Sequence, residues 1–221
     1  MGQYFYLIEK AYDISLISHF IPVIVAIFRL RFFNLFLKIA TVNFTKVLIV
    51  SMLGLYFSYT KQNNQFLFYL SPCLDIILLS LLFVSIFDFR KEIKWALALL
   101  CVIFIAFMIK DYLTSKTLLS SFLTTAETVF VIILLVLMLR KVMLQYKSNT
   151  YKRSLIWILS ALLISNLFSI LISTLMESFA AYSTKFMEFS WYISSFLFTI
   201  ITNLMVAYGF YIIRSKVKEK S

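Results

Sequence analysis

Glycine, proline and charged residues are scarce in this chain, and their scarcity narrows the class of protein. Of 221 residues, three are Gly, two are Pro and 14% are charged, whereas 62% are hydrophobic and the mean hydropathy is +0.93. The three glycines, Gly2, Gly54 and Gly209, lie too far apart in the sequence to form the glycine-rich phosphate loops and nucleophile elbows of soluble enzymes. A soluble domain of this length carries far more charge. The composition therefore indicates an integral membrane protein.

Histidine and cysteine are rare as well. His19 is the one histidine, so neither a second histidine nor a surface cysteine pair is available to share a zinc ion with it. Cys73 and Cys101 both lie inside apolar segments, where packed thiols are the expected state. We therefore expect no metal site, and the missing catalytic motifs weigh against an enzyme.

Long apolar segments recur at close spacing along the whole chain. Each is long enough, or nearly so, to cross a bilayer as a helix at 1.5 Å per residue. The connections between them are too short to hold a soluble module. The sequence predicts an all-α integral membrane bundle of seven transmembrane helices, forming one domain over residues 1–221 with no soluble domain. The helices are expected at residues 13–30, 36–59, 66–88, 93–110, 118–140, 154–178 and 188–213.

The basic residues are distributed unevenly between the two sides of such a bundle. Of 21 Lys and Arg, fifteen lie in the C-terminal tail and the connections after the first, third and fifth segments, and five lie on the opposite side. Positive loops stay in the cytoplasm, so the N-terminus is expected outside and the C-terminus in the cytoplasm, as in a bacterial inner membrane protein. We expect the net charge of +11 to attract anionic lipid headgroups, and not nucleic acid.

Three ionisable residues lie deep within the apolar segments: Lys46, Asp75 and Glu127. At 1.5 Å per residue, both acids sit about 14 Å below the outer ends of their helices. Lys46 lies near 21 Å, and its long stem can reach several Å along its helix. We expect the three to form one electrostatic unit in which Lys46 compensates one carboxylate and the other is protonated much of the time. A purely structural ion pair or triad remains the alternative.

Polar side chains accompany these charges on several of the expected helices. His19 precedes Pro22, which removes a backbone donor and frees the carbonyl of Ser18. On the fifth helix a polar stripe falls within roughly 160° of arc; its members are Ser120, Ser121, Thr124, Thr125, Glu127 and Thr128. We expect one polar pocket in the outer half of the bundle, although plain interhelical hydrogen bonding is the alternative. Its predicted residues are Lys46, Asp75, Glu127, His19, Asn166, Asn203 and Tyr192.

A seven-helix bundle of this size invites comparison with the microbial rhodopsins. Those proteins bind retinal through a lysine of the seventh helix, and here no lysine lies between Lys185 and Lys216. A retinal Schiff base is therefore excluded, and we expect no cofactor.

Four short motifs resemble a group of small, uncharacterised seven-helix membrane proteins from bacteria. They are Ser18-His19-Phe20-Ile21-Pro22, the acid Asp75, Thr125-Ala126-Glu127 and Asn203. In that group the place of Lys46 is usually acidic and follows a threonine, as Thr45 does here. The basic Lys46 departs from that pattern, and the resemblance implies no particular reaction.

These observations favour a ligand-sensing or regulatory membrane protein that acts through a membrane or cytoplasmic protein partner. An intramembrane enzyme that modifies lipids, with Asp75 and Glu127 as the acid and base, is a second hypothesis. A proton-coupled transporter of small molecules that uses the same carboxylates is a third.

Overall fold

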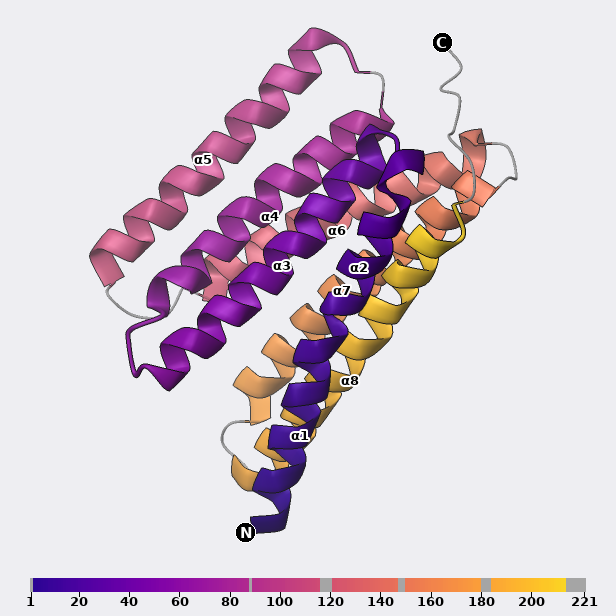
Figure 1. Ribbon diagram of the computed structural model, residues 1–221. Helices are drawn as coiled ribbons and strands as arrows, with labels where there is room; N and C mark the ends of the chain where they lie inside the picture. The colour runs from indigo at the N-terminus through magenta and orange to yellow at the C-terminus, as the bar shows by residue number, and fades with distance from the viewer. Residues whose placement is uncertain (1, 88, 116–120, 147–149, 180–183, 214–221) are drawn as a thin grey trace. The chain divides into compact units, whose positions relative to one another are not determined.

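The computed structural model describes residues 2–87, 89–115, 121–146, 150–179 and 184–213. Over these residues the chain is all-helical and has no strand (Figure 1). The elements in order are α1 (Gly2–Ser18), α2 (Phe20–Arg29), the short 3-10 helix η1 (Leu30–Phe32), α3 (Leu35–Tyr59), α4 (Gln65–Ile86), α5 (Lys91–Ser115), α6 (Ser121–Gln145), α7 (Thr150–Phe179) and α8 (Thr184–Tyr211).

The all-α prediction is confirmed, and each expected apolar segment is helical over most of its described residues. The third and seventh expected segments end too late, because α4 ends at Ile86 and α8 at Tyr211, and residue 88 lies outside the described residues. Residues 118–120, at the start of the expected fifth segment, lie outside the described residues. Among the described residues, five helical stretches are long and apolar enough to cross a membrane, which supports a membrane protein. They are Lys10–Phe32, Leu35–Tyr59, Gln65–Ile86, Lys91–Thr114 and Thr150–Leu171.

The first apolar segment departs from a single regular helix, because the chain breaks between α1 and α2 at His19. The His19 amide donates to the Leu16 carbonyl, three residues back, at 3.2 Å. Pro22 cannot donate a hydrogen bond to the carbonyl of Ser18, so the helix loses a backbone hydrogen bond at this point, although His19 keeps helical backbone angles. Restarting the helix at Phe20 places Pro22 in a first turn, where no intrahelical donor is needed. The expected loss of one backbone bond thus becomes a break.

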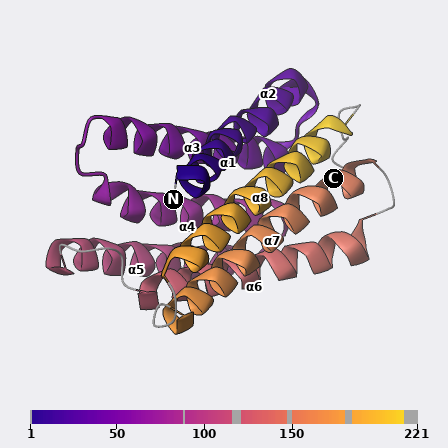
Figure 2. The same ribbon diagram turned by 90° about the horizontal axis from the view of Figure 1, so that it is seen from below.

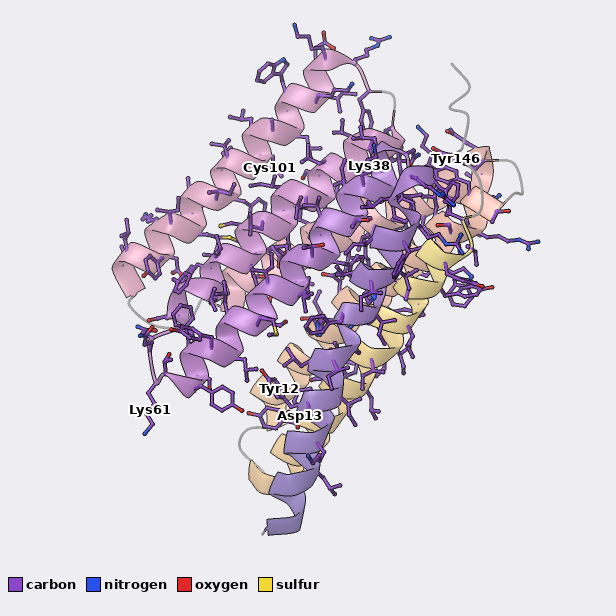
Figure 3. The ribbon with its side chains drawn as sticks, viewed as in Figure 1. Tyr12, Asp13, Lys38, Lys61, Cys101 and Tyr146 are labelled. Atoms are coloured by element: carbon purple, nitrogen blue, oxygen red, sulfur yellow. The ribbon has the colours of Figure 1, made fainter. Side chains whose placement is uncertain are left out.

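The helices divide into two compact units. Unit 1 consists of residues 1–32 and 141–221, and unit 2 of residues 33–140. In unit 2, α4 lies between α3 and α5 (Figures 1 and 2). Lys38 and Lys61 are exposed near the two ends of α3 (Figure 3).

The packing of α4 on α5 rests on side chains that recur at heptad spacing. Tyr69 and Ile76 of α4 form a buried cluster with Cys101 and Met108 of α5. Phe130 of α6 packs against the same cluster. The two thiols therefore serve as packing groups: Cys73 Sγ lies 3.4 Å from the Met108 sulfur, and Cys101 Sγ lies 3.2 Å from Ser80 Oγ.

In unit 1, α8 packs against α1, α2 and α7. Gly209 of α8 is the point of closest approach to α7: a Cβ added there would meet Ile158 Cγ1 at 2.7 Å and the Ser154 carbonyl oxygen at 3.2 Å. Small residues permit such backbone approach between membrane helices. Gly54 of α3 is the opposite case, since a Cβ there would meet nothing within 4 Å.

We predict that Gly209→Ala destabilises the protein and that the matched Gly54→Ala does not. Both changes raise helix propensity by up to about 1 kcal/mol. At residue 209 the added methyl group also overpacks the α7–α8 contact, which typically costs about 1–3 kcal/mol. Thermal unfolding of the purified variants in one detergent measures the difference. Equal melting temperatures for the two variants would mean that α7 and α8 do not approach at Gly209.

Candidate functional site

Lys46 is a basic residue buried in an apolar helix. Asn34 begins α3 because its side-chain oxygen accepts a hydrogen bond from the amide of Leu37, at 3.2 Å. From there the helix runs for 25 residues and places Lys46 on its buried face, with 8% of the side chain exposed. A buried ammonium group requires a counter-charge, which the neighbouring helix supplies.

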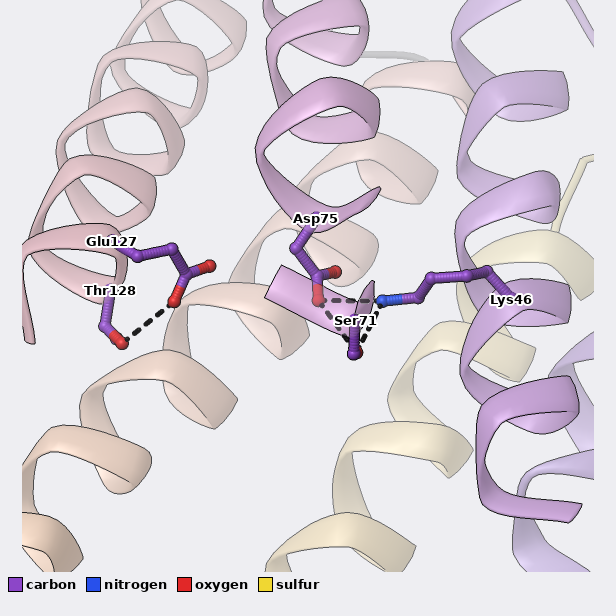
Figure 4. Close-up of polar contacts among 5 residues, drawn as sticks. All are labelled: Lys46, Ser71, Asp75, Glu127 and Thr128. Atoms are coloured by element: carbon purple, nitrogen blue, oxygen red, sulfur yellow. Dashed lines mark hydrogen bonds and ion pairs between the residues drawn. The ribbon is translucent and has the colours of Figure 1, made fainter. Parts of the chain in front are cut away.

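That counter-charge is Asp75 of α4. The Lys46 Nζ lies 2.7 Å from Asp75 Oδ2, and the aspartate side chain is 27% exposed (Figure 4). Ser71 lies one turn before Asp75 and bridges the pair: Lys46 donates to Ser71 Oγ at 3.3 Å, and Ser71 donates to Asp75 at 3.4 Å. The spacing of four residues places Ser71 and Asp75 on one face of α4. Pro72, between them, is accommodated inside the helix.

Glu127 of α6 brings a second carboxyl group to the same unit. Its side chain is buried, with 9% exposed, and one of its oxygens accepts a hydrogen bond of 3.3 Å from Thr128. Glu127 lies close enough to interact electrostatically with Asp75 and Lys46, and its carboxyl group points toward them (Figure 4). We call Lys46, Ser71, Asp75, Glu127 and Thr128 the polar centre.

The charges of the polar centre do not balance. It holds one base and two acids, and the base forms its 2.7 Å ion pair with Asp75. Among the residues that the structure describes, Glu127 has no basic group within 4.0 Å. A buried carboxylate without a counter-charge is costly, so Glu127 is the member whose charge is most easily changed by a proton or a bound cation.

A separate group of polar side chains lies in unit 1, at the break between α1 and α2. The carbonyl of Ser15 accepts hydrogen bonds from Ser18 Oγ at 2.6 Å and from His19 Nδ1 at 2.9 Å. Asn203 of α8 donates to Ser18 Oγ at 2.8 Å. The side chains thus replace the backbone bonds lost at the break and join it to α8. These contacts make His19 and Asn203 structural in this unit.

The predicted pocket residues therefore fall into different groups. Lys46, Asp75 and Glu127 come together in unit 2, whereas His19 and Asn203 surround the helix break in unit 1. Asn166 donates to the Leu162 carbonyl of its own helix at 2.8 Å. Tyr192 is exposed, and its ring stacks on Phe196, one turn along α8, at 6.0 Å. Of the stripe around Glu127, Ser120 and the side chains of Ser121 and Thr124 lie outside the described residues.

Sequence reasoning missed several polar contacts of unit 2. Asn43, one turn before Lys46, is only 2% exposed, and its side-chain oxygen is buried with no hydrogen-bond partner among the described residues. Its spacing from Lys46 could have indicated that it shares the buried face. Tyr69 donates to Asp111 of α5 at 3.2 Å. Asp111 lies at the end of an expected helix, where an exposed acid needs no partner. Its hydrogen bond with Tyr69 therefore could not be predicted from the sequence.

Comparison with family models, with curated proteins and with solved structures finds no match to this chain. Within the described ranges, no three His, Cys, Asp or Glu side chains gather as a metal site would require. The polar centre is therefore the candidate functional site.

We predict that Lys46→Met is severely destabilising, because it leaves two acids in unit 2 without a buried base. Removing one partner of a buried ion pair typically costs about 3–5 kcal/mol. The matched control is Lys38→Met, which makes the same chemical change at an exposed position of the same helix and should cost less than about 0.5 kcal/mol. Thermal and denaturant unfolding in detergent would measure both. If the two variants are equally stable, the ion pair contributes nothing to the fold.

Proposed function

We propose that this protein is a membrane-embedded sensor that regulates a partner, and that the polar centre is its sensing element. The proton or ligand that occupies the centre would supply the positive charge that the centre lacks. The observation that carries the proposal is the charge imbalance: Lys46 pairs with Asp75 at 2.7 Å, while the buried Glu127 is held by a hydroxyl group.

Because the two acids lie on different helices, binding of a proton or ligand at the polar centre would change how those helices pack. Asp75 belongs to α4 and Glu127 to α6, so two ionised carboxylates repel one another across those helices. A proton or a bound cation at Glu127 cancels its charge, removes that repulsion and favours closer packing. An occupant that interacts differently with two packings of the helices shifts the equilibrium between them, which is the requirement for a switch.

Other atoms at or near the polar centre could contact a ligand, and the partial exposure of Asp75 would allow the ligand to reach it. Asp75 is the most exposed member of its ion pair, and its second oxygen makes no hydrogen bond or ion pair in the part of the chain that the structure describes. The buried oxygen of Asn43, one turn from Lys46 on α3, is a further acceptor. An occupant with donor groups, such as an ammonium group, fits this chemistry better than an anion does.

The proposal includes seven transmembrane helices with the N-terminus outside and the C-terminus in the cytoplasm of a bacterial cell. Its support is the uneven distribution of the basic residues and the five helical stretches already long enough to span. In this orientation the polar centre belongs to the outer half of the bundle, and a membrane or cytoplasmic partner reads the inner face. Membership of the small seven-helix bacterial group remains a prediction.

Proton-coupled transport of a small molecule is the second candidate, and the buried Glu127 also favours it. A carboxyl group that gains and loses a proton within a membrane is a common element of transporters. The lipid-modifying enzyme is supported less well, because Lys46 and Ser71 already engage one oxygen of Asp75. Acid–base chemistry at Asp75 would first require that pair to open.

We predict that α4 and α6 approach one another when the pH is lowered. Protonation of Glu127 on acidification removes its repulsion toward Asp75, which stays paired with Lys46 at 2.7 Å; Cys73 is another titratable group that interacts with Glu127. Spin labels on the exposed residues Leu81 of α4 and Ile133 of α6, with Cys73 and Cys101 replaced by alanine, would report the change as a shorter mean distance in lipid bilayers.

The matched control is Glu127→Gln, which keeps the side-chain shape and an acceptor for Thr128 but cannot ionise. It should show the short distance at every pH. The proposal fails if the parent distance is independent of pH, or if the Gln variant responds as the parent does. Proton flux into vesicles that contain the purified protein would instead favour the transporter.

A further inference from the structure

One end of unit 1 is formed where three helices meet. There α2 ends at Arg29, α7 begins at Thr150 and α8 ends at Tyr211 (Figure 1). The contact of Gly209 with Ser154 joins α8 to α7, and the guanidinium group of Arg29 lies over the ring of Tyr211, which joins α2 to α8. We call this the basic end.

The side chains described at the basic end carry positive charge without any acid. The last turn of α6 also lies here, because Lys152 of α7 donates to the carbonyl of Met143 at 2.7 Å. Among the described side chains of unit 1, the acid Asp13 lies on α1, near the opposite end (Figure 3). The described basic residues of this end are Arg29, Arg31, Lys141, Lys152 and Arg153.

Exposed aromatic rings accompany this charge. Trp157 and Tyr208 are both exposed and meet edge to face, with ring centroids 5.1 Å apart. Tyr211, one turn beyond Tyr208, is 54% exposed. Tryptophan and tyrosine gather at the level of lipid headgroups, because their rings are amphipathic. The exposed aromatic residues are therefore of the kind that gathers at a membrane–water boundary.

Two arginines of the basic end are held by aromatic rings. The guanidinium carbon of Arg29 lies 5.2 Å from the ring centre of Tyr211, and that of Arg31 lies 4.6 Å from the ring centre of Phe32. A guanidinium group over a ring keeps a defined plane, and its N–H groups remain available at its edge. Those N–H groups match the oxygens of a phosphate in a bidentate arrangement. The guanidinium groups of Arg29 and Arg31 therefore present N–H groups that can bind the oxygens of a phosphate group.

We propose that Arg29, Arg31 and Tyr211 form a binding site for the phosphate group of an anionic phospholipid. A lipid is favoured over a free phosphate ion because the apolar and aromatic surface beside the arginines can contact its acyl chains and glycerol. The net positive charge of the end favours an anionic lipid over a zwitterionic one. This inference requires membrane residence and does not depend on the polar centre of unit 2.

Quenching of Trp157 fluorescence by lipids with brominated chains would measure the site directly. Trp95 and Trp191 are replaced by phenylalanine, and the purified protein is placed in vesicles that mix phosphatidylcholine with brominated phosphatidylglycerol. We expect phosphatidylglycerol to bind beside Trp157 more tightly than phosphatidylcholine does. Arg29→Gln and Arg31→Gln should each weaken this preference about fivefold, which corresponds to about 1 kcal/mol per basic residue.

The matched control is Arg153→Gln, which removes the same charge from the same end at an exposed position that no described aromatic ring contacts. It should change the preference by less than about twofold. Arg29→Lys keeps the charge but loses the bidentate geometry and should lie between parent and Arg29→Gln. Thermal unfolding in phosphatidylcholine alone checks folding, and the exposed Arg31 provides the test if the Arg29 variants unfold.

Several outcomes would overturn the proposal. Equal losses in Arg31→Gln and Arg153→Gln would mean a general attraction of charge with no site. Equal binding of the two lipids would exclude a role for the anionic headgroup. Displacement of the brominated lipid by inorganic phosphate at moderate, constant ionic strength would assign the site to a free anion.

Discussion

The ion pair between the buried Lys46 and the partly buried Asp75 is the electrostatic constraint on the packing of unit 2. An ammonium group within an apolar helix cannot remain without a counter-charge, so α3 and α4 must pack with these residues opposite one another. The 2.7 Å contact fixes the register of the two helices, and Ser71 supports it from one turn away. Apolar side chains of α4 pack against α5 and form the buried cluster of unit 2.

The second acid gives the polar centre a property that a purely structural pair would lack. If stability were its sole role, one base and one acid would suffice. Glu127 adds a carboxyl group on α6 that Lys46 cannot fully compensate, at the cost of burying it. The packing of α6 then depends on whether a proton or a ligand is bound at the Glu127 carboxyl group. This is the physical reason to place function here, and not at His19 and Asn203, which each donate a hydrogen bond at the helix break.

Much of the fold could be predicted from the sequence because apolar length and boundary charges determine where membrane helices form. The three deep ionisable residues could also be predicted to gather, since each needs the others. The break at His19 could not, because whether Pro22 bends a helix or restarts it depends on contacts such as that of Asn203 with Ser18. The bridging role of Ser71 and the burial of Asn43 depend on helix rotation, which hydropathy does not determine.

A double-mutant cycle would measure how strongly Lys46 and Asp75 interact. The unfolding free energies of the parent, Lys46→Met, Asp75→Asn and the double variant are measured in one detergent. If the buried pair organises unit 2, the double variant loses less stability than the sum of the single losses, by at least about 1 kcal/mol. Losses that add to within about 0.5 kcal/mol would show that the two side chains do not interact and would contradict this account.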